Sequence, residues 1–343
     1  MACNLPDSGS IRPQSVTWPK PACPVSVGSS SLADVTTTQD PGQAAARPTT
    51  TRTWLPVAAV ATTLVLWASA FVAIRHLGDD FSAGPLALGR NAVGALALLA
   101  LALPRFRRPG PGQWWRLVVI GLLWYAVYNV ALNEGEQHVD AGTASLVLQS
   151  APVMVALLAA VFLGERFTAT KAVGLALAIA GVGLISTSGS GSGDPGSDLL
   201  GVLLCALAAL VYAVSLIVQK PLMATLPAVE VTAVACAVGA VACLPWAGRL
   251  VDEAAAAPTS SVLWMVYLGL FPTAIGFTCY AYALNHMPAS NLAVTTYLIP
   301  VITIVMAWLL LDETPASLAY VGGVVTLVGV SIARRRPRAV PAA

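Results

Sequence analysis

The stretches "VFLGERFTATKAVG" (residues 161–174) and "LLLDETPASLAYVG" (residues 309–322) each interrupt a long apolar run of this chain. Each places a glutamate, Glu165 or Glu313, in a short polar gap, and the two glutamates are 148 positions apart. A polar gap between apolar runs is typical of a turn between two membrane-spanning helices. Its recurrence so far along the chain indicates two copies of one structural unit.

The composition excludes a soluble globular protein. Hydrophobic residues make up 57% of the 343 positions and charged residues only 10%, whereas soluble domains carry about 25% charged residues. The formal net charge is +2, and no clusters of Lys and Arg alternate with aromatic residues, which argues against nucleic-acid binding. The chain is therefore expected to be a polytopic membrane protein.

Ten apolar segments are long enough to cross a bilayer, which takes about 17–25 residues. They run approximately over residues 55–75, 85–103, 115–135, 141–163, 171–187, 198–218, 228–247, 261–284, 288–311 and 316–333. Few residues remain between most of them. The sequence therefore predicts an all-α polytopic membrane protein with ten transmembrane helices.

Two registers relate the halves of the chain. A shift of 145 positions pairs "LWASAFVAIR" (66–75) with "VYAVSLIVQK" (211–220). A shift of 148 positions pairs His138 with His286, Ala141 with Ala289, Pro152 with Pro300, Gly174 with Gly322 and Gly181 with Gly329. Each unit holds five spans, an odd number, so the second unit enters the membrane from the opposite side. We expect two inverted five-helix repeats, an architecture common in secondary transporters, with the substrate site between the repeats.

The composition divides the chain into five parts. The first is rich in Ser, Thr, Pro and Ala and cannot bury enough apolar surface to order itself, and the middle one is a Gly/Ser linker. We expect a disordered cytoplasmic tail at 1–52, a first repeat at 53–187, the linker at 188–197, a second repeat at 198–334 and a basic cytoplasmic tail at 335–343.

The distribution of Lys and Arg predicts the orientation. With a cytoplasmic N-terminus, fifteen of these residues lie on the inside, and two, Arg75 and Arg249, lie on the outside. An excess of positive charge on the cytoplasmic side is the rule for membrane proteins. We therefore expect a multi-pass protein of the plasma (inner) membrane with both termini in the cytoplasm.

The two glutamates of the opening stretches are expected to have a structural role at helix turns. Thr314 is placed to cap the last span and Pro315 to begin it. A carboxylate near a helix N-terminus is stabilised by about 0.3–1 kcal/mol through the helix dipole. A gating role for Glu165 and Glu313 is the alternative.

The paired motifs resemble a known family, the EamA-type ten-span transporters of the drug/metabolite transporter superfamily. The resemblance covers residues 55–335 and rests on "LWASAFVAIR", on "PLALGR" in the second span, and on the two copies of the opening motif, each preceded by a proline. It implies export or exchange of small metabolites across the inner membrane, often amino acids or amphipathic drugs.

Three ionisable residues fall inside predicted spans: Arg90, Glu134 and Glu136. Such residues are costly in a membrane and are therefore candidates for function. By the expected topology all three lie toward the outer leaflet, so Arg90 is expected to pair with Glu134. Two interpretations stay open, a structural ion pair and a proton- or substrate-responsive gate.

Uncharged polar and aromatic residues near Pro152 and Pro300 form the candidate substrate site. Proline frees a backbone carbonyl, and such positions are tolerated where they line protein or a wet cavity. The candidates are Trp67, Asn129, Gln149, Tyr212, Thr295, Thr296 and Tyr297. The 148-residue register places Gln149 at the position of Tyr297. Packing between helices is the alternative role for these residues.

Three function classes compete. A secondary transporter of a small molecule, working by alternating access, is the preferred interpretation. A channel is the alternative, and a membrane-embedded enzyme comes third, since the sequence has no His-Glu-x-x-His or Gly-x-Ser-x-Gly motif. No cofactor, metal or nucleic acid is expected. The expected partners are the lipid bilayer, the small-molecule substrate and a coupling proton.

Overall fold

The computed structural model describes residues 54–162, 169–187, 195–287, 292 and 295–333. The expected tails, most of the Gly/Ser linker and Glu165 lie outside the described residues. The described part is all-α, as predicted.

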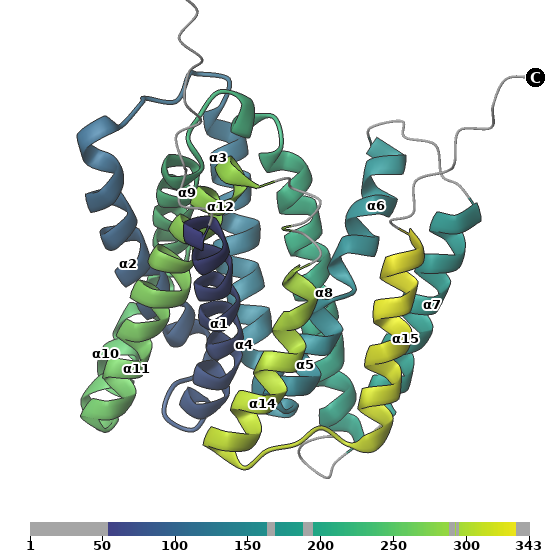
Figure 1. The fold of residues 1–343 in the computed structure, drawn as a ribbon. Coiled ribbons are helices and arrows are strands. Elements are labelled where there is room, and N and C mark those ends of the chain that lie inside the picture. Colours follow the sequence, from purple (N-terminus) through teal and green to yellow (C-terminus); the bar gives the residue numbers. More distant parts are fainter. Residues whose placement is uncertain (1–53, 163–168, 188–194, 288–291, 293–294, 334–343) are drawn as a thin grey trace, which may run out of the picture. The chain divides into compact units, whose positions relative to one another are not determined.

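Figure 1 shows the helical elements of the first repeat, which run from α1 to α7. The third span passes through a π-helical segment, η2, and the fourth is broken between α5 and α6. In chain order the elements are α1 (Trp54–Leu77), α2 (Ala83–Ala102), η1 (Leu103–Arg105), α3 (Trp114–Ile120), η2 (Gly121–Tyr128), α4 (Asn129–His138), α5 (Ala141–Leu148), α6 (Ala151–Phe162) and α7 (Ala169–Ser186).

The second repeat follows the same plan, with a short helix, α10, added after its second span. Its elements are α8 (Pro195–Gln219), η3 (Leu222–Ala224), α9 (Ala228–Ala242), η4 (Leu244–Trp246), α10 (Ala247–Ala256), α11 (Thr259–Leu268), the π-helical η5 (Gly269–Ile275), α12 (Gly276–His286), η6 (Thr296–Leu298), α14 (Ile299–Leu311) and α15 (Ser317–Ala333).

The apolar helices agree with the predicted number of spans. Five described helices are long and apolar enough to cross a membrane, and the bent pair formed by α9 with the following segment counts as a sixth. Four shorter apolar helices, within 141–155, 169–185, 296–311 and 317–333, lie at the remaining predicted spans. Within the described residues, the fourth span of each repeat changes helix type part-way, at 149–150 and at 296–298.

The helix irregularities recur in the register of the repeat. The π-helical segments begin at Gly121 and Gly269, which are 148 positions apart. The second halves of the broken spans begin at Ala151 and Ile299, again 148 positions apart. Irregular turns inside membrane helices are frequent at functional sites. Because the irregularities recur in both repeats, the region around the π-helical segments and the broken spans is the candidate position of a functional site.

The packing of the helices has the symmetry of an inverted repeat. The corresponding helices α2 and α9 pack together, as do α7 and α15. The packing of α4 on α8 is matched by that of α12 on α1, and the packing of α5 and α6 on α8 is matched by that of α14 on α1. Exchanging the two repeats thus leaves these helix pairs unchanged, as two inverted five-helix repeats require.

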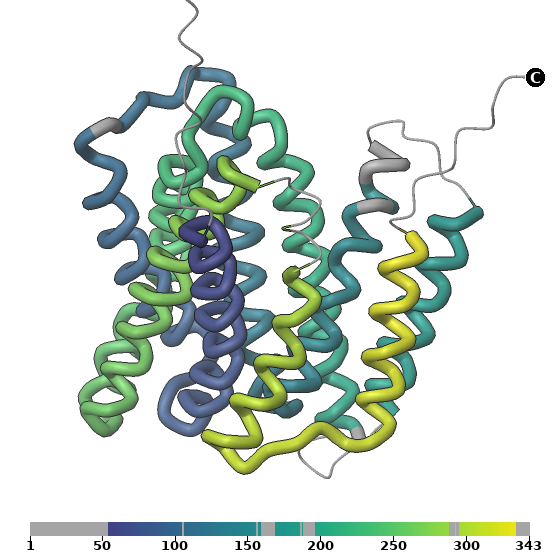
Figure 2. Tube along the Cα trace, viewed as in Figure 1, coloured from purple at the N-terminus to yellow at the C-terminus, as the bar shows by residue number. Residues whose placement is uncertain are grey.

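Glycine contacts hold α7 against α15, which lie side by side in Figure 2. A Cβ atom added to Gly174 would lie 2.5 Å from the carbonyl oxygen of Gly329, and one added to Gly181 would lie 2.5 Å from that of Gly322. The early glycine of one helix meets the late glycine of the other, so the two helices are antiparallel. Small residues permit this backbone approach.

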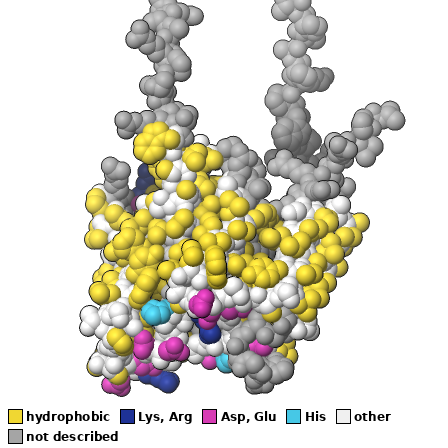
Figure 3. Space-filling model, turned by 60° about the horizontal axis from the view of Figure 1, so that its bottom comes forward, with side chains coloured by type: hydrophobic (Ala, Val, Ile, Leu, Met, Phe, Trp, Pro, Cys, Tyr) yellow, Lys and Arg dark blue, Asp and Glu magenta, His cyan; other side chains and the backbone are white. Residues whose placement is uncertain are grey.

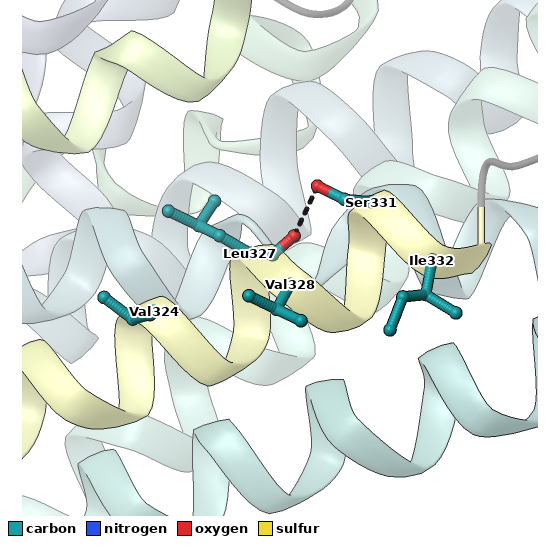
Figure 4. A pocket seen from close by; sticks show the side chains of 5 residues that line it. All are labelled: Val324, Leu327, Val328, Ser331 and Ile332. Atoms are coloured by element: carbon teal, nitrogen blue, oxygen red, sulfur yellow. Dashed lines mark hydrogen bonds between the residues drawn. The ribbon is translucent and has the colours of Figure 1, made fainter.

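The opposite face of α15 is apolar and exposed (Figure 4). Val324 is 60% exposed and Val328 47%. With Leu327, Ser331 and Ile332 they line a shallow hollow of about 390 Å³. The Ser331 hydroxyl donates to the Leu327 carbonyl at 2.8 Å, so even the polar side chain is satisfied within the helix. This face suits contact with lipid.

The predicted cap of the last helix is wrong, although the predicted span, from residue 316, begins within one residue of the helix. Asp312, with a φ of 56°, ends α14 in the left-handed region, and residues 312–316 form the turn. The helix α15 begins at Ser317, so Thr314 does not cap it and Pro315 does not open it. The left-handed residue redirects the chain before the capping signal, which delays the helix.

A matched pair of substitutions tests the glycine contact. Gly181→Leu should reduce the amount of folded protein in the membrane. Overpacking destabilises the folded state by about 1–3 kcal/mol, and the atom that the new side chain would meet belongs to the backbone of Gly322, which cannot move aside as a side chain can. Gly183→Leu, two positions along the same helix, is the control, since a Cβ atom there meets nothing within 4 Å. Size-exclusion chromatography of detergent extracts measures both. Equal yields of the two variants would contradict the contact.

Candidate functional site

A cavity of about 870 Å³ lies between the two repeats. Residues of every span line it, and Lys171, Lys220 and Ala333 line one of its ends. These three residues lie near the start of α7, just after α8 and at the end of α15. The cavity therefore extends from the middle of the bundle to this end, which we call the open end.

Aromatic side chains from both repeats form the cavity wall. The ring of Trp67 lies 5.3 Å from that of Phe277 and 5.0 Å from that of Tyr280. The ring of Trp124 lies 4.8 Å from that of Tyr212, between centroids. Trp67 and Tyr212 were predicted for the site and do line the cavity. Such rings offer large apolar faces to a ligand.

The π-helical segment η2 supplies a polar group to the wall. The backbone carbonyl of Tyr125, inside η2, accepts hydrogen bonds from the side-chain amides of Asn91 and Asn129, the latter at 2.8 Å. Asn129 also donates to the Asn91 side-chain oxygen at 3.1 Å. Both asparagines are buried and line the cavity, and Asn129 is one of the residues expected in the substrate site. The network fixes the orientation of both amides.

The two broken spans meet across the repeats. The Gln149 side-chain amide, at the break between α5 and α6, donates to the Thr296 carbonyl at 3.3 Å. Both residues line the cavity. The predicted site residues Thr295 and Tyr297 are not among its lining residues. The Thr295 hydroxyl donates to the Leu292 carbonyl at 2.7 Å, and Tyr297 packs against the apolar cluster around Val330.

The predicted ion pair between Arg90 and Glu134 is not formed. A carboxyl oxygen of Glu134 lies 3.7 Å from Nε2 of His138, and its side chain is 44% exposed. Glu136 instead faces the bundle: it is 1% exposed, and neither carboxyl oxygen has a hydrogen-bond partner. The wider turns of η2 rotate α4 relative to a regular helix. Glu134 and Glu136 are two residues apart, so they face opposite sides of α4, with Glu136 inward and Glu134 outward.

An ion pair lies at the other end of the bundle, which we call the closed end because neither of the paired residues lines the cavity. Nε of Arg75, at the end of α1, lies 2.9 Å from a carboxyl oxygen of Glu313. Its Nη1 donates to the carbonyls of Glu136, at 2.9 Å, and Gln137, at 3.3 Å. In Figure 3, in which the bottom of Figure 1 comes forward, charged side chains gather below a broad hydrophobic surface. Glu313 thus ties the turn between α14 and α15 to a distant helix.

Asp140 caps α5 near the closed end. Its carboxylate oxygens accept hydrogen bonds from the Thr143 amide at 2.8 Å and from the Thr143 hydroxyl at 2.7 Å. Burial raises the pKa of the Asp140 carboxyl above its ordinary value, while these hydrogen bonds act in the opposite direction. A satisfied cap of this kind fixes where the broken span begins.

Sequence reasoning missed several residues of the wall. Phe277 is one of them, although the 148-residue register pairs it with Asn129, which was predicted. Trp124 is another, and its position inside η2 has no sequence signal beyond the preceding Gly121. Among the described residues, no group of three or more His, Cys, Asp and Glu side chains is placed to hold a metal ion.

The orientation of α4 can be tested with cysteine substitutions in a chain freed of its natural cysteines. Glu134→Cys should react readily with a maleimide in detergent, because its side chain is exposed. Glu136→Cys should stay unreacted until the protein is denatured. Mass spectrometry of the labelled protein measures both. The reverse reactivity would contradict the orientation of α4.

Comparison with known proteins agrees with this architecture. The relatives include a probable terminal-alkyne amino-acid exporter of Streptantibioticus cattleyicolor, 39% identical over 81% of this chain and 93% of the relative. They also include an uncharacterized transporter of Bacillus subtilis, 34% identical over 77% of this chain and 86% of the relative. A probable amino-acid metabolite efflux pump of Escherichia coli is 30% identical over 63% of this chain and 73% of that protein.

A solved crystal structure and a family match complete the comparison. The solved structure aligns with a TM-score of 0.54 at 20% identity, over 81% of this chain and 96% of the other. At that identity the likeness concerns the fold alone. The EamA-like transporter family matches residues 54–187 and again residues 199–335. The chain belongs to the EamA-like transporter family and is a multi-pass membrane transporter.

Proposed function

We propose that this transporter exports a small amphipathic metabolite of amino-acid type by alternating access. The observation that carries the proposal is the cavity between the repeats. Its volume of about 870 Å³ is in the range of sites for small molecules, about 300–1,000 Å³. Aromatic rings line it together with the amides of Asn91 and Asn129. Such a wall suits a ligand with one apolar and one polar part.

The two ends of the bundle support alternating access. The ion pair of Arg75 with Glu313 closes one end, and Lys220 lines the cavity at the other. Under the 145-residue register Lys220 corresponds to Arg75. Inverted repeats can exchange their conformations, which would close the open end and open the closed one. A channel is a poorer fit because one end is closed.

The charge distribution supports the direction of transport. With fifteen Lys and Arg residues inside and two outside, both termini and the open end face the cytoplasm. The cavity then faces the compartment from which an exporter loads. The Streptantibioticus relative is named as a probable terminal-alkyne amino-acid exporter, which supports substrates of amino-acid type.

An efflux assay with propargylglycine, a terminal-alkyne amino acid, tests the proposal. Cells that overproduce the chain should tolerate more of this compound and release the preloaded, labelled compound faster than cells with an empty vector. Release should saturate with concentration, because a transporter must change conformation in each cycle. Release that rises linearly without saturation would favour a channel, and release equal to the vector control for all amino acids tested would contradict the proposal.

Two conservative variants refine the same assay. Gln149→Leu should weaken the apparent affinity about two- to tenfold, because a hydrogen bond contributes about 0.5–1.5 kcal/mol. Tyr297→Phe is the control, since Tyr297 corresponds to Gln149 in the repeat but does not line the cavity. It should transport normally per molecule. A loss of affinity in Tyr297→Phe with normal affinity in Gln149→Leu would contradict this assignment.

A further inference from the structure

Arg90 is a cation of the cavity wall whose hydrogen-bonding capacity is unused. It is 8% exposed and lines the cavity. Its Nε and Nη1 atoms are buried without a hydrogen-bond partner. A guanidinium has five N–H donors and stays protonated in proteins. An unpaired charge of this kind is costly inside a protein, so it calls for an anion.

The described part of the chain does not provide that anion. No ion pair reaches Arg90 from a described carboxylate, and the pair expected with Glu134 is absent. Glu136 is buried on α4, but it does not line the cavity and forms no hydrogen bond with the guanidinium. The amides of Asn91 and Asn129 are already held by the Tyr125 carbonyl.

The backbone of Arg90 is held firmly at a helix crossing. A Cβ atom added to Gly269, at the start of η5, would lie 2.6 Å from the carbonyl oxygen of Arg90. One added to Gly94, the next turn of α2, would lie 3.3 Å from the carbonyl oxygen of Gly269. The two helices therefore approach backbone to backbone on both sides of the crossing. Arg90 enters the cavity wall from a fixed position.

We propose that Arg90 binds the carboxylate of the transported molecule. The inference rests on the proposed function and specifies its substrate class, a small molecule with a carboxylate and an apolar part. The planar guanidinium can donate two parallel hydrogen bonds to a carboxylate, a geometry that lysine cannot reproduce. The aromatic side chains of the same cavity then contact the apolar part of the molecule.

Calorimetry on the purified full-length chain in detergent tests this role with two ligand pairs that differ only in the carboxylate. The pairs are propargylglycine with its amide, and hexanoate with hexanamide. The wild-type chain should bind the acid of a pair about tenfold or more tightly than the amide, as a charge-assisted hydrogen bond implies. Arg90→Gln should lose this preference and bind acid and amide alike.

Two further variants separate recognition from folding. Arg107→Gln, the same substitution at an exposed arginine outside the cavity wall, should keep the preference of the wild-type chain. Arg90→Lys keeps the charge but loses the planar guanidinium, so its preference for the acid over the amide should be intermediate. This variant replaces Arg90→Gln in the test if Arg90→Gln does not fold. An undiminished preference in either Arg90 variant, or no preference in the wild-type chain, overturns the proposal.

The outcomes also distinguish the subsite from the proposed function. A preference for the acids that depends on Arg90, in a chain that exports no amino acid, would support the subsite and contradict amino-acid export. Export of propargylglycine by a chain that binds the acid and the amide equally would support amino-acid export and contradict the carboxylate subsite.

Discussion

The backbone contact between α7 and α15 is the constraint on which the rest of the bundle depends. Gly174 and Gly181 of one helix meet Gly329 and Gly322 of the other, so the contact maps onto itself when the repeats are exchanged. It has the form of an isologous interface between two copies of one unit. Apolar burial gives little drive for association in lipid, so close packing of small residues carries more of the stability there. The remaining spans then pack in exchanged pairs around the cavity.

The helix irregularities convert this symmetric bundle into a binding site. Backbone groups in a membrane must be satisfied within the protein. The carbonyl of Tyr125 in η2 is satisfied by two asparagines, and that of Thr296 in the broken ninth span by Gln149. These side chains therefore have a structural role and line the cavity at the same time. The two interpretations considered for them, packing and binding, are compatible.

The spans and the repeat could be predicted because their signals are local: apolar length, and glycine, proline and histidine in a fixed register. The arrangement of the ionisable residues could not be predicted, because a π-helical segment rotates everything after it and leaves almost no trace in the sequence. Glu134 was expected to pair with Arg90 because both lie toward the same leaflet, but depth alone does not say which side of α4 a residue occupies, and Glu134 lies on the outer side. Tyr297 was placed in the cavity by register alone, whereas the 3₁₀ turn around it directs the ring to the apolar cluster near Val330.

The inversion of the repeats is the central claim, and the sidedness of two corresponding turns tests it most directly. Asp79 lies in the turn after α1, and Ala224 lies at the corresponding place after α8, 145 positions later. In a chain freed of its natural cysteines, Asp79→Cys and Ala224→Cys can each be labelled in intact cells with a membrane-impermeant thiol reagent. Inverted repeats predict labelling from outside at Asp79→Cys and only after permeabilisation at Ala224→Cys. Labelling of both from the same side would contradict the inversion.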